Sequence, residues 1–109
     1  MAEVSQAPEW QYTVVDVADN STTVSTGPCM VKSMWVQTVL SAHVVPILDG
    51  AVAIDSFAAS AAVSTKKEFD GVKFVTSLII DPNDAGTGKI IVVWKPNHDG
   101  QAGTGYGLP

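Results

Sequence analysis

The chain has 109 residues, a net charge of -5 and a hydrophobic fraction of 46%. Its length predicts one domain with one core, and its many Val and Ile residues favour half-buried β-strands. All six basic residues are lysines, whereas a nucleic-acid-binding protein normally presents a basic face that includes arginine. We therefore expect no nucleic-acid partner.

The cysteine content and the N-terminus limit the class of protein further. Cys29 is the only cysteine, so the chain forms no internal disulfide and no thiolate metal cluster. No apolar run reaches the roughly 18 residues that span a bilayer. The N-terminal "MAEVSQAPEW" lacks the basic and apolar regions of a secretory signal. We expect a soluble chain with no membrane partner.

The first part of the chain predicts an arm followed by three strands. Residues 1–9 are small and polar, which predicts an extended N-terminal arm. Strand patterns follow at 10–17, 22–26 and 29–40, with turn residues between them. In 29–40 apolar residues occur at both parities, which predicts a strand that is either central in its sheet or covered on both faces.

A hairpin is expected next, with its turn at Asp49-Gly50 and its two strands within 43–57. Pro46 predicts that the first of these strands lies at an edge or contains a bulge. Residues 58–69 are rich in Ala, Ser and Thr, which predicts a surface crossover with at most one helical turn, closed by Asp70-Gly71. The alternation in 72–80 predicts a further strand.

The last strand is expected at 89–95, and the Gly-rich residues 97–109 predict a C-terminal tail without a packed core. The β-domain then spans 10–96. About six to eight short strands separated by turns predict an all-β fold, either a single small β-sandwich or a jelly-roll-like barrel.

The stretch "DPNDAGTGK" at 81–89 is the nearest approach to a functional motif. A calcium loop of the EF-hand type fails because Ala85 and Val92 stand where oxygen ligands are required. A phosphate-binding loop fails because a strand, and not a helix, follows Lys89. We expect a hairpin loop between two strands, with a weak calcium site at Asp81 and Asp84 as the alternative. No cofactor is expected.

Catalytic candidates are sparse. Asp49 and Asp55 could face each other across the hairpin, but they stand at a turn and a strand end, where solvated aspartates are common. His43 has no metal-ligand neighbour, and no nucleophile-elbow sequence surrounds Ser41. Cys29 is interpreted as a small buried apolar residue. We expect a protein that is not an enzyme.

The aromatic residues divide into two groups. Trp35 and Trp94 lie within apolar strands and are expected to pack in the core. Aromatic residues beside the two arms are expected to anchor a protein interface. Together with the exposed loop, the expected interface residues are Trp10, Tyr12, Pro82, Asn83, Asp84 and Tyr106.

Two stretches, "LSAHVVPILDGAVAI" and "FDGVKFVTSLIIDPNDAGTGKIIVVWKP", resemble small virion proteins of tailed bacteriophages, and among these most closely the capsid decoration (cement) proteins. The resemblance covers residues 24–96. It implies a non-enzymatic protein, made in the host cytoplasm, that lies on the capsid surface of the virion. Its implied partners are the major capsid protein and copies of itself, for example in a trimer.

The alternative is a phage tail or fibre module that binds host-surface glycans. An exposed cluster of two or more aromatic residues on one face would favour this alternative, because sugars stack on exposed rings. Burial of Trp35 and Trp94 would favour the decoration role.

Overall fold

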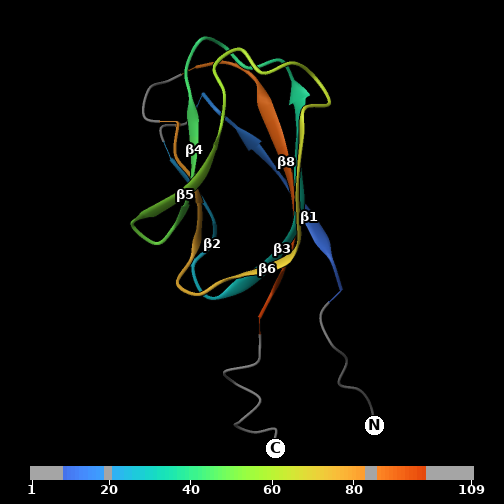
Figure 1. The fold of residues 1–109 in the computed structure, drawn as a ribbon, viewed down its shortest axis with the longest axis vertical. Coiled ribbons are helices and arrows are strands. Elements are labelled where there is room, and N and C mark those ends of the chain that lie inside the picture. Colours follow the sequence, from blue (N-terminus) through green and yellow to red (C-terminus); the bar gives the residue numbers. More distant parts are fainter. Residues whose placement is uncertain (1–8, 19–20, 83–85, 98–109) are drawn as a thin grey trace, which may run out of the picture.

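The computed structural model describes residues 9–18, 21–82 and 86–97. Eight strands in these ranges form two four-stranded antiparallel sheets that face each other, and these ranges contain no helix (Figure 1). The expectation of a small all-β sandwich is therefore confirmed. No helix in the described ranges is long and apolar enough to cross a membrane.

The chain passes back and forth between the two sheets. Sheet 1 has the strand order β1-β8-β3-β6, formed by β1 (Gln11–Asp16), β8 (Lys89–Pro96), β3 (Cys29–Thr38) and β6 (Lys66–Phe74). Sheet 2 has the order β2-β7-β4-β5, formed by β2 (Thr22–Ser25), β7 (Leu78–Ile80), β4 (Val45–Asp49) and β5 (Val52–Phe57). Each sheet therefore combines strands from both ends of the chain.

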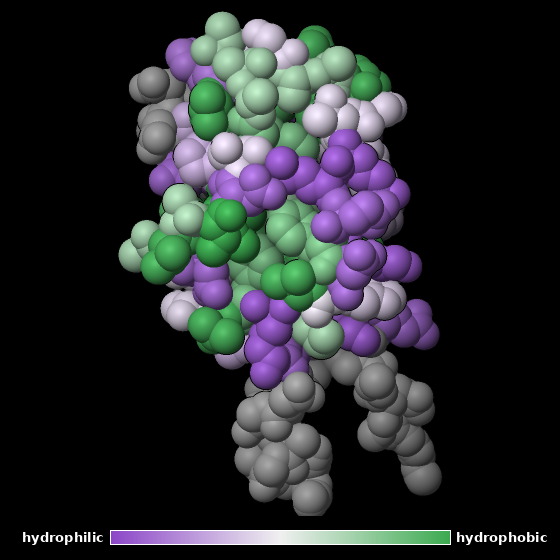
Figure 2. All heavy atoms as spheres, viewed as in Figure 1, coloured by the Kyte–Doolittle hydropathy of each residue, from purple (hydrophilic) through white to green (hydrophobic). Residues whose placement is uncertain are grey.

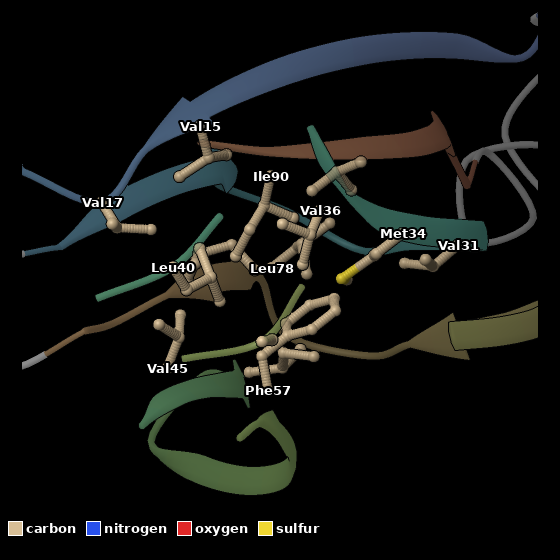
Figure 3. Packing of buried hydrophobic residues seen from close by; sticks show 14 of the residues in the cluster. Val15, Val17, Val31, Met34, Val36, Leu40, Val45, Phe57, Leu78 and Ile90 are labelled. Atoms are coloured by element: carbon tan, nitrogen blue, oxygen red, sulfur yellow. The ribbon is translucent and has the colours of Figure 1, made fainter. Parts of the chain in front are cut away.

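The core lies between the two sheets, because side chains alternate across a strand and each sheet buries one face. Figure 3 shows apolar side chains from both sheets meeting in this layer. Sheet 1 contributes Val15, Val31, Met34, Val36, Phe74, Ile90 and Val92, and sheet 2 contributes Val45, Ile47, Phe57, Leu78 and Ile80. Full burial of such a side chain stabilises the fold by about 2 kcal/mol.

β3 is a central strand, as predicted, and it contains a β-bulge. The register of β3 against both of its neighbours shifts between Val31 and Ser33. Relative to β8, β3 has one extra residue at this shift, and it changes the parity of β3, so that Val31 and Met34 both face the core. The bulge, and not burial on both faces, explains why apolar residues occur at both parities of 29–40.

The predicted hairpin at 43–57 is confirmed as β4 and β5. β4 lies between β5 and β7, so the edge position suggested by Pro46 is wrong. The register between β4 and β5 shifts at Ile47 and Leu48, but the extra residue, Ile54, belongs to β5 and not to the strand that contains Pro46. The crossover after β5 contains no helical turn. Asp70-Gly71 does not close it, because both residues lie within β6 at positive φ.

The expected single strand at 72–80 is also wrong. β6 ends at Phe74 in sheet 1, and β7 begins at Leu78 in sheet 2, so residues 75–77 cross between the sheets. The apolar alternation continues through this crossing, which is why the sequence pattern does not reveal it.

Asp49 holds this crossing in place. Its carboxylate accepts hydrogen bonds from the backbone N–H groups of Val75 (2.9 Å), Thr76 (2.9 Å) and Ser77 (3.3 Å). Desolvation by burial raises the pKa of Asp49, but the three N–H groups outweigh it, and the pKa lies below its ordinary value. The ionised carboxylate is therefore part of the folded structure.

We expect the substitution Asp49→Asn to lower the free energy of unfolding at pH 7 by about 1 kcal/mol, because an amide accepts these hydrogen bonds more weakly. A lowered folded-state pKa stabilises the protein above the unfolded value, near pH 4, and this stabilisation is lost as the pH falls through the folded value. Urea unfolding of both proteins at pH 7 and pH 3 measures the effect. A difference that is the same at both pH values would contradict the role of the ionised form.

Candidate functional site

The 81–89 stretch connects the two sheets and is not a hairpin loop. β7 belongs to sheet 2 and β8 to sheet 1, so the segment joins different sheets. Its described residues are fixed by backbone hydrogen bonds, in which Gly86 N donates to Val17 O and Val17 N donates to Gly88 O. The Thr87 N–H also donates to Ser41 Oγ (3.0 Å). These contacts tie the segment to two other parts of the chain.

Gly88 is required for this crossing. Its φ is +117°, and a Cβ atom added there would lie 2.6 Å from the carbonyl oxygen of Val39. We expect Gly88→Ala to lower the free energy of unfolding by about 3 kcal/mol, through backbone strain and the clash. Gly27→Ala is the matched control, because no atom lies within 4 Å of the added Cβ. Urea unfolding compares the two variants, and equal losses of stability would show that the close approach at Gly88 is unimportant.

Of the predicted interface residues in the 81–89 loop, the structure describes only Pro82. Pro82 is buried. Asn83 and Asp84, and with Asp84 half of the alternative calcium site, lie outside the described residues, as does Tyr106. Within the described part of the chain, no group of three or more His, Cys, Asp or Glu side chains is placed to hold a metal ion.

Among the remaining polar candidates, Asp49 and Asp55 make contacts within the fold, and Cys29 is buried. Asp49 caps the 75–77 crossing, and Asp55 forms an ion pair of 3.3 Å with Lys67. Cys29 is fully buried, as expected, and burial raises the pKa of its thiol to about 11. Such a thiol stays protonated at neutral pH and is a poor nucleophile. His43 is exposed, in the segment between β3 and β4.

A groove with aromatic walls lies on the outer face of sheet 1. Its volume is about 490 Å³. The lining residues come from β1, from the residue directly before it, and from β3 and β8. They are Trp10, Gln11, Tyr12, Val14, Trp35, Gln37, Ile91 and Val93. Tyr12 is 70% exposed and Val14 is 45% exposed. An exposed apolar surface of this kind in a small domain typically marks an interaction site.

Strand register assembles the groove. Tyr12 is paired with Val93, and Ile91 stands between Val14 on one side and Trp35 on the other. The side chains of these rows face outward because Val15, Ile90 and Val92, at the opposite parity, are buried. The Trp35 side chain also faces outward, because the bulge between Val31 and Ser33 changes the parity of β3 before Trp35 is reached.

Lysine side chains flank the aromatic rings. The Nζ atoms of Lys95 and Lys32 lie 4.6 Å and 5.8 Å from the ring centroid of Trp10. Lys66 Nζ lies 6.0 Å from the ring centroid of Trp35, and it also forms an ion pair of 2.9 Å with Glu68. These distances are those of cation–π contacts, which hold the ammonium groups beside the groove.

The expectation for the two tryptophans is half right. Trp94 is partly buried and packs against the core, and its Nε1–H donates to Thr13 Oγ1 (3.0 Å). Trp35 instead stands on the outer face. Of the expected interface residues, Trp10 and Tyr12 come together in the groove. The contributions of Trp35 and Val93 were not predicted, because they depend on the bulge and on strand pairing.

Comparisons of the chain with protein-family models, with curated proteins and with solved structures found no match. The fold and the groove therefore define a class no finer than a small all-β protein with an aromatic outer face. The resemblance to virion proteins stays a sequence-based prediction.

Proposed function

We propose that the protein is a non-enzymatic binding module that docks onto another protein through the groove on sheet 1, and that it serves as a decoration protein on the capsid of a tailed bacteriophage. The groove carries this proposal, because exposed aromatic and aliphatic side chains form its centre and charged side chains form its rim. Protein interfaces have this anatomy, with aromatic anchors at the centre. The capsid setting comes from the sequence resemblance.

The proposed mechanism is passive. Docking removes Tyr12, Val14 and their neighbours from water, which supplies the favourable free energy of association. Each bound copy stabilises the shell only while it is bound, so the total stabilisation depends on occupancy. Many copies that bridge neighbouring capsid subunits would make opening of the lattice less favourable. Association of copies with one another, for example as a trimer, is part of the proposal, and light scattering of the purified protein measures it.

A second candidate function is glycan binding by a tail or fibre module. Trp10, Tyr12 and Trp35 on one face favour it, and the amides of Gln11 and Gln37 in the groove could hydrogen-bond a sugar. However, a sugar stacks on an open ring face. Lysine side chains lie over the rings of Trp10 and Trp35, so only the Tyr12 ring has no such contact among the three. This arrangement favours the protein partner.

The experiment uses phage particles made without this protein, to which purified protein is added back. We expect added wild-type protein to raise the temperature at which the particles release their DNA. We expect Tyr12→Ala to weaken binding to the particles by about tenfold, because an exposed aromatic anchor is lost. Binding is measured by co-sedimentation over a range of protein concentrations.

The matched control compares two exposed valines on edge strands of opposite sheets. Val14→Gln should weaken binding, whereas Val52→Gln on β5 should not, because Val52 is 64% exposed on the other sheet. Equal particle stability with and without the protein would contradict the decoration role. Binding to a glycan array, lost in Tyr12→Ala, would support the second candidate instead.

A further inference from the structure

The charged residues are distributed unequally between the two sheets. The strands of sheet 1 carry all six lysines together with three carboxylates, Asp16, Glu68 and Asp70. The strands of sheet 2 carry no lysine, and their only charged residues are Asp49 and Asp55. A chain with a net charge of -5 therefore concentrates its positive charge on one sheet. Figure 2 shows hydrophilic side chains over the side on which Figure 1 draws β6.

Most of these lysines belong to the outer face, where the groove lies. Lys89 and Lys95 have the same parity in β8 as Ile91 and Val93, which line the groove. Lys32 and Lys66 lie over groove rings. Lys67 differs from these four, because it pairs with Asp55 of sheet 2 and its Nζ atom lies 5.4 Å from the centroid of the Phe57 ring.

We propose that the surface docked on this groove belongs to an acidic protein, whose apolar side chains enter between the rings while its Asp and Glu carboxylates pair with Lys32 and Lys95. This inference rests on the proposed function, since it names the chemistry of the partner at the same site. Charge complementarity carries it, because uncharged side chains line the groove and the ammonium groups of Lys32, Lys95 and Lys66 lie over its two tryptophan rings.

The ring contacts restrain these lysine side chains and leave N–H donors available for a carboxylate. An ammonium group placed over an indole keeps N–H donors that point away from the ring, and its side chain is already restrained. A partner carboxylate therefore gains its ion pair with a smaller loss of side-chain entropy than at a freely rotating lysine. At the rim of an apolar interface, such pairs act mainly on orientation and on the rate of association.

Other anionic partners fit the groove less well. Single-stranded nucleic acid combines phosphate contacts with bases stacked on open aromatic faces. Here lysines lie over the rings of Trp10 and Trp35, and the chain contains no arginine for bidentate phosphate binding. An acidic glycan would likewise need an open ring face. An acidic protein surface needs none, because its apolar side chains fill the groove that Tyr12 and Val93 line.

The test measures binding to capsid shells assembled without this protein, by co-sedimentation at low and at high NaCl concentration. The variant Lys32→Gln with Lys95→Gln removes two positive charges beside Trp10. Its matched control, Ala51→Glu with Ala53→Glu, changes the net charge by the same amount at exposed positions in the turn before β5 and at the start of β5. We expect the lysine variant to bind about fivefold more weakly at low salt, and the control to bind like the wild type.

Salt gives a second readout, because it screens exposed charge pairs. Wild-type binding should weaken as NaCl rises, and the lysine variant should depend less on salt. Wild-type binding that neither salt nor the lysine variant changes would overturn the acidic partner and leave the proposed function standing. Equal weakening in both variants would also overturn it, as would displacement from the shells by single-stranded DNA or by a glycan. Failure of the wild-type protein to bind shells would overturn both proposals.

Discussion

The β-bulge between Val31 and Ser33 is the constraint on which the rest of this structure depends. One residue of β3 that is extra relative to β8 lets the strand bury Val31 before the shift and Met34 and Val36 after it. The same shift places Trp35 on the outer face of sheet 1. A regular strand would bury Trp35 with Val31 and expose Met34, so the core and the groove would both be lost. The bulge therefore links the packing of the interior to the candidate site on the surface.

The crossings between the sheets form a second set of constraints. The 75–77 crossing is held by the Asp49 carboxylate, and the 86–88 crossing is held by backbone bonds to Val17 and Ser41. Each sheet contains strands that are distant in sequence, so these crossings must turn sharply to return the chain to the other sheet. The fold therefore explains why the acceptor Asp49 and the glycine Gly88 stand where they do.

Local signals predicted much of this fold. β-Branched alternation located most strands, Asp49-Gly50 located the hairpin, and Cys29 was correctly expected to be buried. The errors concern features that local patterns do not encode. Alternation runs through 72–80 although the chain changes sheets there, and turn residues at 81–89 do not reveal which sheet the next strand joins. Trp10 and Tyr12 were predicted as interface residues from their place beside an arm, but the groove itself depends on pairing with β3 and β8.

The burial of Cys29 has a consequence for how the protein can be studied. Its thiol is inaccessible and protonated at neutral pH, so thiol-specific reagents should spare it while the two sheets stay together. A fluorophore attached to a cysteine newly introduced on the outer face would then be the single label, with the native residue left in place. Conversely, Cys29 of the unaltered protein would react only when the sandwich opens, so the rate of its modification would report the rate or extent of opening.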